Sequence, residues 1–516
     1  MKSFIKISSV FSFGLILTTV SCTKLEEETF GSRSIDKGGA ASASSLQGVY
    51  DQLNGQADQA NTYALQEHPT DEMMGPTRGT DWGDFGAWRK LHTHTWDPSH
   101  QQINDTWDQL NTGVYRASQV VAGSTDNSIK GQASFLRAWF MFQVIDLYGQ
   151  APFREIGGNP DDNPKVLNRK DATDFIIKDL EFAEANLGTA TPGKASKSAA
   201  QALLAKVYLN RAVYSAPAVG GPFTFVKADM DKVIEYSNKV MAAGYQLNGA
   251  GQYFDNFSWD NSTKSKEIIF AIENSETQAP GNARNRWRMG LHYNSFGKKD
   301  QGGWNGFTTL ADFYKSFEAT DERRGGTYPG LTDKIGLRTG FLVGQQFGIA
   351  GAPLQERGGK PLIFTPEVNI NRANESQGIR VIKYFPKPDA SNNVNDDQSG
   401  NDYIFLRYAD VLLMKAEAIF RGGSDPLAQT PAVILNSIRV PRGATPIVTV
   451  DAKAILAERG RELYYEGWRR NDQIRFGTFN EPVDQRATKT DLSKTLYPIP
   501  QRAVDTNPNL VQNPGY

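Results

Sequence analysis

Flat aromatic side chains in polar loops are the residues of this chain whose chemistry points most directly to a ligand. Three of the nine tryptophans stand in loops rich in glycine and charged residues: Trp82, Trp287 and Trp304. A pyranose ring presents an apolar C–H face and a rim of hydroxyl groups, so its binding site needs aromatic surfaces beside amides, carboxylates and guanidinium groups. We therefore predict that these three indoles form a platform for a polysaccharide or oligosaccharide.

Polar residues beside these tryptophans are candidates for contacts with sugar hydroxyls. They are Arg78, Asp81, Asp84, Arg286 and Asn305. Trp88 is a further candidate, and its position leaves both ligand contact and packing open. For each loop tryptophan the alternative is that it packs its own loop onto the scaffold. The remaining tryptophans stand in helical or strand patterns that favour packing: Trp96, Trp107, Trp139, Trp259 and Trp468.

The predicted platform implies weak binding. Three ring contacts at about 1 to 1.5 kcal/mol each, with a few net hydrogen bonds at about 1 kcal/mol, sum to roughly 5 to 8 kcal/mol. This corresponds to dissociation constants between about millimolar and micromolar. Three flat rings favour an extended β-linked chain, such as a β-glucan or a xyloglucan, over a coiled one.

A pair of glutamates raises the alternative of a hydrolase. Glu462 and Glu466 are four residues apart in a predicted helix, which places their Cβ atoms about 5 to 6 Å apart, near the spacing of a retaining glycosidase pair. Two carboxylates on one helical face seldom flank a bond from both sides, and four arginines stand nearby. The sequence contains no GxSxG, P-loop or HExxH motif. We interpret the pair as ion-paired and predict no catalytic residues.

Two segments could be read as metal sites. His92, His94 and His100 lie close together in the sequence, but histidines beside a turn are more often hydrogen-bonded structural residues. The Asp- and Asn-rich loop Asp389–Asp402 has Val394 where an EF-hand needs glycine and Gly400 where it needs glutamate. We predict no metal site and no cofactor, with calcium in this loop as the alternative.

The chain is organised around the segment Phe135–Pro152, which is apolar on nearly every side at helical spacing. A helix of this kind lies inside a protein. Gly149 and Pro152 should end it. Arg137 would then be a buried cation that needs a carboxylate or carbonyl partner.

Helical periodicity elsewhere predicts a mainly α fold, in which tetratricopeptide-like helix pairs form a scaffold with long loops and a few short strands. The predicted helices are Leu46–Leu53, Trp107–Gly123, Ala172–Asn186 with Asp171 as its cap, Ala199–Tyr214, Asp229–Ala243, Leu310–Arg324, Phe405–Ile419, Val433–Arg439 and Ala452–Arg470. The predicted strands are Leu91–Trp96, Ile268–Ile272 and Arg380–Phe385. Residues 46–516 would form one domain, with the helical scaffold mainly in 101–247 and 403–516 and the ligand-side loops mainly in 61–100 and 275–310.

The composition excludes several classes of protein. With 56 Lys and Arg against 57 Asp and Glu, nothing favours a nucleic-acid partner. The single cysteine, Cys22, excludes an intrachain disulfide and a cysteine-based structural zinc site.

The N-terminus has the pattern of a lipoprotein signal peptide. Lys2 and Lys6 precede the apolar stretch Val10–Val20, which is too short to span a membrane stably, and Ser21 precedes Cys22. We predict a signal peptide over 1–21, acylation of Cys22 and a flexible tether over 22–45. The alternative is an ordinary secretory peptide with a free thiol.

Several segments together resemble the SusD/RagB family of Bacteroidetes outer-membrane nutrient-binding lipoproteins. They are FLRAWFMFQVIDLYGQAP, DFYKSFEATDERR, LRYADVLLMKAEA, LAERGRELYYEGWRRNDQIRFG and the C-terminal LYPIPQRAVDTNPNLVQNPGY. The resemblance implies a glycan-binding lipoprotein, anchored to the outer membrane and facing the cell exterior, that acts with a SusC-like TonB-dependent transporter. The acidic run after Cys22 resembles the export signal of such lipoproteins. The alternatives are a surface lid for peptide import, a protein adaptor and an all-helical glycan hydrolase.

Overall fold

The computed structural model describes residues 43–516 apart from 160, 190–191, 298–301, 393 and 395–398. The predicted signal peptide, Cys22 and nearly all of the predicted tether lie outside the described residues. So does part of the loop considered for calcium. Acylation of Cys22 and the calcium alternative therefore stay untested predictions.

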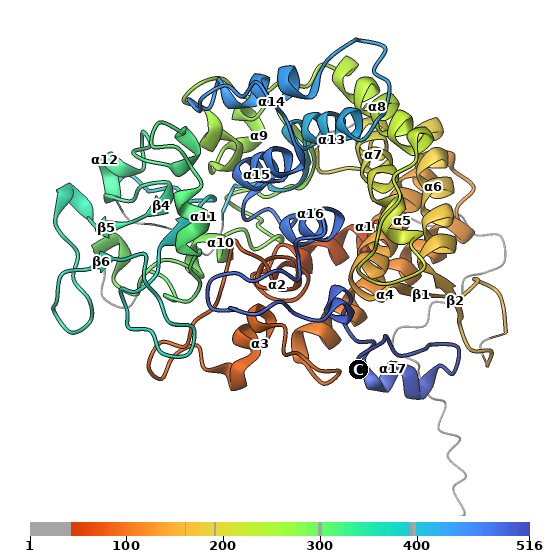
Figure 1. The fold of residues 1–516 in the computed structure, drawn as a ribbon, viewed down its shortest axis with the longest axis horizontal. Coiled ribbons are helices and arrows are strands. Elements are labelled where there is room, and N and C mark those ends of the chain that lie inside the picture. The colour runs from red at the N-terminus through yellow and green to blue at the C-terminus, as the bar shows by residue number, and fades with distance from the viewer. Residues whose placement is uncertain (1–42, 160, 190–191, 298–301, 393, 395–398) are drawn as a thin grey trace, which may run out of the picture. The chain divides into compact units, whose positions relative to one another are not determined.

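Five long helices form the scaffold on one side of the described part (Figure 1): α4 (Gln101–Gly123), α5 (Asn127–Tyr148), α6 (Arg169–Asn186), α7 (Lys197–Tyr214) and α8 (Lys227–Ala242). Each packs against the next along the chain, the arrangement expected of stacked antiparallel helix pairs. The mainly α fold is confirmed. The cap of α6 differs from the prediction, since the side chain of Asn168 accepts a hydrogen bond from the backbone N–H of Asp171.

Helix α5 is the predicted central helix. The Asp126 carboxylate accepts hydrogen bonds from the N–H groups of Ser128 and Ile129 and caps its start. Gly149, with φ of 76°, ends it in the left-handed conformation that glycine adopts without steric cost. Arg137 forms two hydrogen bonds of 2.7 Å to the carboxylate of Asp179 on α6. The predicted need of Arg137 for a partner is confirmed.

The C-terminal helices return to the scaffold, where the first of them packs against α8 and α7. They are α13 (Tyr408–Phe420), α14 (Pro431–Arg439), α15 (Ala452–Leu463), α16 (Arg469–Arg475) and α17 (Gln501–Thr506). The prediction of one helix over Ala452–Arg470 was wrong, because the chain turns between α15 and α16, where Tyr465 and Gly467 have φ of 61° and 81°. The predicted helix Phe405–Ile419 begins instead as a strand.

Strands are short and pair two by two in antiparallel fashion. The pairs are β1 (Gln150–Phe153) with β2 (Lys165–Asn168), β3 (Ile268–Ile272) with β8 (Tyr403–Arg407), β4 (Gly340–Leu342) with β7 (Arg380–Ile382), and β5 (Gly344–Gln345) with β6 (Ile363–Phe364). The predicted strand Ile268–Ile272 is confirmed, and only the first half of Arg380–Phe385 is strand. The remaining helices are short: α1 (Ala43–Tyr50), α2 (Asn61–Glu67) and α3 (Ala87–Thr93) precede the scaffold, and α9 (Asn261–Lys264), α10 (Asn285–Arg288), α11 (Ala311–Lys315) and α12 (Thr332–Ile335) lie between β3 and β4 or just before β3.

Two further predictions of local structure were wrong. Leu91–Trp96 was predicted as a strand, but its first residues belong to α3, which His94 ends with φ of 57°. Leu310–Arg324 was predicted as one helix, but it contains only α11 and a 3-10 turn over Glu322–Arg324. In both segments the apolar spacing reflects packing of short turns onto the core. No helix in the described part is long and apolar enough to cross a bilayer.

Candidate functional site

Two of the three predicted tryptophans are joined by a hydrogen bond. Trp82 and Trp304 are both partly exposed. The Nε1 of Trp82 donates a hydrogen bond of 2.7 Å to the backbone carbonyl of Trp304. The inner side of the Trp82 ring packs on Phe307 and Trp88, with centroid distances of 5.0 and 6.1 Å. A contact between residues 222 positions apart therefore fixes the Trp82 indole against the backbone of Trp304.

A glycine makes room for the Trp82 ring. A Cβ atom at Gly306 would lie 2.3 Å from Cζ2 of Trp82, and one at Gly303 would lie 2.3 Å from the backbone oxygen of Leu291. Real carbon atoms do not approach so closely. Close packing therefore requires glycine at both positions near Trp304. This is a second reason for these glycines, beside the loop structure that a glycine-rich sequence predicts.

The loop that carries Trp82 is strained. Trp82, Asp84 and Phe85 have φ of 58°, 36° and 50°, a region that costs non-glycine residues roughly 1 to 2 kcal/mol each. This geometry leaves the ring of Phe85 fully exposed, at 103% of its reference area. Sequence reasoning missed Phe85 because it considered only tryptophans, although the flanking Gly83 and Gly86 were a usable signal.

Polar side chains from four loops converge beside the indoles. The Tyr293 hydroxyl donates a 2.5 Å hydrogen bond to Asp81. Arg357, in the loop between β5 and β6, donates to Asp81 at 3.2 Å and to Glu375 at 2.7 Å, and its guanidinium lies 3.8 Å from the Tyr293 ring centroid. Arg357 and Asp81 are partly exposed, at 39% and 36% of their side-chain area. Their free lone pairs and N–H groups can therefore reach a ligand.

The surroundings of Tyr293 and His292 set the protonation states of these two side chains. Burial, with the neighbouring Asp81 carboxylate, raises the pKa of Tyr293 well above its usual value. Burial lowers the pKa of His292 to about 4, although Glu375, 3.0 Å away, favours the charged form. At neutral pH Tyr293 is therefore a neutral hydroxyl and His292 a neutral imidazole, while their neighbours Glu375, with a lowered pKa, and Arg357, with a raised pKa, are charged.

Trp287 does not belong to this surface. Its side chain is completely buried, so the prediction that it forms part of an exposed platform was wrong. Trp88 is also buried, and its Nε1 donates a 2.7 Å hydrogen bond to Asp84. Both indoles pack their loops onto the core, which was the alternative interpretation from the sequence.

Three predicted polar contacts are buried as well. Arg78 donates hydrogen bonds to the carbonyls of Gly306, Asn374 and Gln377. Arg286 stacks 3.4 Å from the Tyr63 ring centroid, and Asn305 donates to the carbonyl of Glu375. Because no part of these side chains reaches a surface ligand, their prediction as ligand contacts was wrong. Arg78 and Asn305 instead tie together the loops that hold the two indoles.

The other tryptophans follow the packing prediction. Trp96, Trp107, Trp139 and Trp468 are buried in the core. Trp259 is partly exposed and packs edge-on against Tyr328. Among the nine tryptophans, only Trp82, Trp259 and Trp304 thus keep partial exposure, and of these Trp82 directly follows Asp81 in the chain.

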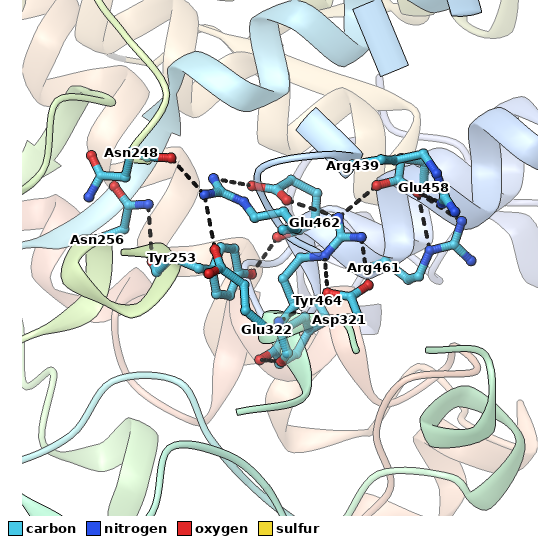
Figure 2. Close-up of polar contacts among 12 residues, drawn as sticks. Asn248, Tyr253, Asn256, Asp321, Glu322, Arg439, Glu458, Arg461, Glu462 and Tyr464 are labelled. Carbon is cyan, nitrogen blue, oxygen red and sulfur yellow. Dashed lines mark hydrogen bonds and ion pairs between the residues drawn. The ribbon is translucent and has the colours of Figure 1, made fainter. Parts of the chain in front are cut away.

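The glutamates considered for catalysis are structural. Glu462 lies in α15 and Glu466 beyond its end, so they do not share a helical face. Glu462 pairs with Arg323, Arg407 and Arg442 at 3.0, 2.8 and 3.3 Å. Figure 2 shows Glu458 and Glu462 of α15 facing the segment with Asp321 and Glu322. Burial opposes ionisation of Glu462, but these arginines outweigh it and hold its pKa far below the usual value. The carboxylate is saturated by arginine partners and has no free face for a substrate.

The predicted histidine cluster is also engaged in hydrogen bonds. The two ring nitrogens of His92 lie 3.0 and 2.8 Å from the carbonyl oxygens of His68 and Asp484, and Nε2 of His94 lies 2.8 Å from that of Pro69. Burial lowers the pKa of both rings, and a neutral His92 ring donates to only one of its two carbonyls. Within the described residues, no group of three or more His, Cys, Asp or Glu side chains is placed to hold a metal ion.

Two protein-family models match the chain. The model described as "SusD family" matches residues 266–516. The model described as "Starch-binding associating with outer membrane" matches residues 31–209. Together they include the residues described above around Trp82, which we call the loop surface: Asp81, Trp82, Phe85, Tyr293, Trp304, Arg357 and Glu375.

Known proteins show the same similarity over most of their length. The starch-binding protein SusD of Bacteroides thetaiotaomicron is 25% identical over 502 residues, covering 88% of this chain and 85% of that protein. A SusD superfamily protein from Parabacteroides distasonis has a similar structure, with a TM-score of 0.68, 20% identity and coverage of 92% of this chain and 99% of the other. A structure described as a laminarin binding SusD-like protein gives a TM-score of 0.66, 19% identity and coverage of 92% and 98%. At these identities the structural similarities establish the fold.

Proposed function

Since this chain belongs to the SusD/RagB family, we propose that it is a cell-surface lipoprotein that captures polysaccharide or oligosaccharide without cleaving it. It delivers the glycan to a SusC-like TonB-dependent transporter in the outer membrane. Acylated Cys22 anchors it, facing the cell exterior. Relatives support the ligand class, since one is named a starch-binding protein and another a laminarin binding protein.

The observation that carries the proposal is a pair of partly exposed tryptophans, Trp82 and Trp304, with the charged residues Asp81 and Arg357 next to Trp82. The C–H faces of successive sugars stack on Trp82 and Trp304. Ring hydroxyls donate to Asp81 and accept from the Arg357 guanidinium. The Tyr293 hydroxyl orients Asp81 through its 2.5 Å hydrogen bond. The Phe85 ring offers a third apolar face at the edge of the same loop.

This surface binds weakly enough to release its ligand. Two or three ring contacts at about 1 kcal/mol each, with two or three net hydrogen bonds at about 1 kcal/mol, give roughly 4 to 6 kcal/mol. The corresponding dissociation constants lie between about a millimolar and tens of micromolar. A receptor that passes its ligand to a transporter needs rapid dissociation, which follows from such affinities.

The glycan class stays a proposal with less support than the site. The sequence argument for an extended β-linked chain relied on three exposed indoles, and Trp287 is buried. A β-glucan or xyloglucan therefore has to be compared directly with an α-glucan.

Affinity gel electrophoresis tests the proposal. Gels containing laminarin, xyloglucan or soluble starch should retard the mature chain on at least one polysaccharide. Trp82→Ala and Trp304→Ala should each remove most of the retardation. Tyr115→Ala, which removes an exposed ring on α4, is the matched control and should change nothing.

Two results would contradict parts of the proposal. If both indole variants migrate as the wild type does, the loop surface is not the binding site. If no polysaccharide retards the chain but peptides protect it against thermal unfolding, the peptide-import alternative is favoured. Release of reducing sugar by the purified chain would contradict a role limited to binding.

A further inference from the structure

A second concave site lies away from the loop indoles, at the end of the β3–β8 pair. It is a cavity of about 590 Å³, within the usual range for small-ligand sites, about 300 to 1,000 Å³. Residues from α1, from the segments that follow β3 and precede β8, and from the loop before α7 line it. Its polar lining comprises Gln47, Asp51, Asn54, Lys194, Ser262, Glu273, Asn274, Ser275, Gln278 and Asp402.

Asp402 is the unusual residue of this cavity. It is only 2% exposed, and its backbone is held by Asn261, which bonds to both its N–H and its carbonyl. One carboxylate oxygen accepts a 2.9 Å hydrogen bond from the N–H of Asn274. Among the described residues, the other oxygen has no hydrogen-bond or ion-pair partner. A buried carboxylate without a cation is costly unless donors surround it, so this side chain is suited to accept hydrogen bonds from a ligand in the cavity.

The neighbouring charges define what such a ligand is. Glu273 is exposed at the same end of the cavity and has no partner among the described residues. The Nζ of Lys194 lies against α1, 4.4 Å from the Tyr50 ring centroid and 3.3 Å from the Gln47 side-chain oxygen. Asp402 and Glu273 therefore offer acceptor oxygens without a lysine or arginine partner, and a ligand beside them has to supply hydrogen-bond donors.

A metal ion does not fit this description. The three carboxylates of the cavity, on Asp51, Glu273 and Asp402, do not form a group that could hold one ion together, and the volume far exceeds that of an ion. The only aromatic ring in the lining, Tyr50, is covered by Lys194, and its hydroxyl already bonds to Gln132 and Ala195. The lining therefore offers hydrogen-bonding groups and no free aromatic face for stacking.

We propose that this cavity is a second saccharide-binding site, in which Asp402 and Glu273 accept hydrogen bonds from the hydroxyl groups of a neutral sugar. The proposal rests on the proposed function for the class of ligand. It differs in place and in chemistry, because the loop surface binds through indole faces and this cavity through carboxylates and amides.

Isothermal titration calorimetry with maltoheptaose, laminarihexaose and xyloglucan heptasaccharide tests the proposal. In the Trp82→Ala/Trp304→Ala double variant, at least one of these should still bind saturably at millimolar concentration. Adding Asp402→Asn, which keeps the shape and the bond from Asn274, should weaken this residual binding at least tenfold. Adding Glu273→Gln should weaken it several-fold, whereas Glu276→Gln, an exposed carboxylate three residues away, should have no effect.

Several outcomes overturn the inference. Absence of residual binding in the double variant, or residual binding that both Asp402→Asn and Glu273→Gln leave unchanged, shows that the cavity does not bind sugar. Binding of calcium alone that Asp402→Asn removes, with no saccharide heat, assigns the cavity to a cation instead. The two proposals fail separately. If the Trp82→Ala/Trp304→Ala double variant binds as strongly as the wild type, the loop surface is refuted as a binding site but the cavity is not. If the double variant does not bind at all, the cavity is refuted but the loop surface is not.

Discussion

The loop surface around Trp82 and the buried network around Glu462 use the same kinds of side chain with opposite consequences. At the loop surface, Arg357 stacks on Tyr293 and bonds to Asp81 while all three keep some exposure. In the network, Arg407 and Arg442 surround Glu462 with no exposure at all. A carboxylate whose lone pairs are all taken by buried arginines holds helices together, whereas one with a free edge in water can exchange partners with a ligand.

The comparison also separates two kinds of tryptophan. Trp287 and Trp304 stand in loops of similar composition, yet one is enclosed and the other half-exposed. Residue type and local polarity are therefore insufficient to assign a binding role. What decides the role of a tryptophan is how much of its ring is left uncovered by segments that are distant in the sequence. The Trp82 ring, for example, is held by the backbone carbonyl of Trp304.

The largest effect is expected where the buried network loses its centre. Glu462→Ala leaves Arg323, Arg407 and Arg442 without a shared partner, and breaking a buried ion pair in this way costs about 3 to 5 kcal/mol. Urea unfolding followed by circular dichroism measures the change. Glu481→Ala, which removes an exposed pair with Lys489, should cost about 1 kcal/mol or less. If the two variants lose the same free energy of unfolding, the buried network is no more important for stability than an exposed ion pair.

Trp287→Ala and Trp304→Ala should differ in the property that they damage. Removal of the buried Trp287 ring should cost about 3 to 5 kcal/mol of stability. Removal of the half-exposed Trp304 ring should cost less stability and remove glycan retention. Thermal unfolding and affinity gels on the same preparations test this, and a larger fall in melting temperature for Trp304→Ala would contradict the assignment.

Acid should destabilise the buried network. Burial opposes ionisation of Glu458, but Arg323, Arg461 and Arg439 outweigh it and lower its pKa to about 2. A folded-state pKa below the unfolded value means that the unfolded chain binds more protons at acidic pH. The stabilisation is therefore complete above about pH 4.5 and is lost as pH falls toward 2, and a shift of this size is worth on the order of 3 kcal/mol.

The measurement for this prediction is the free energy of unfolding between pH 3 and pH 7. Glu458→Gln should be less stable than the wild type at pH 7 and should show a flatter acid dependence. A slope identical to that of the wild type would mean that Glu458 does not contribute to acid sensitivity.

Gly306→Ala tests whether the loop surface is built by close packing. The added methyl group meets the Trp82 ring at 2.3 Å, so the indole has to move and glycan retention should fall nearly as far as in Trp82→Ala. Gly188→Ala, where nothing lies within 4 Å of the added atom, is the matched control. Unchanged retention for Gly306→Ala would show that the position of the indole is not critical.

Phe85→Ala should have the smallest effect. The ring is fully exposed, so its removal should leave the melting temperature unchanged. If the ring stacks on a sugar, its loss weakens binding by about 1 kcal/mol, roughly fivefold. Calorimetric titration with the oligosaccharide that binds best gives the ratio, and an unchanged affinity would remove Phe85 from the site.

Local sequence patterns predicted the helical scaffold well. The central helix, the need of Arg137 for a carboxylate and the end of α5 at Gly149 all follow from residues within a few turns of each other. They were predictable because helical spacing and glycine termination are local effects. The breaks within predicted helices were missed, since the positive φ of Tyr465 is imposed by its surroundings.

For the candidate site, the sequence determined the residue types and the tertiary structure decided which of them face water. Glycine-rich loops with tryptophan, aspartate and arginine pointed to a sugar-binding surface before any fold was known. Only the fold buries Trp287, Arg78 and Arg286, leaves Trp82 and Trp304 half-exposed, and brings Tyr293 and Arg357 beside Asp81. The physical reason is that a side chain's exposure depends on which distant segments pack over it, and no local pattern encodes that.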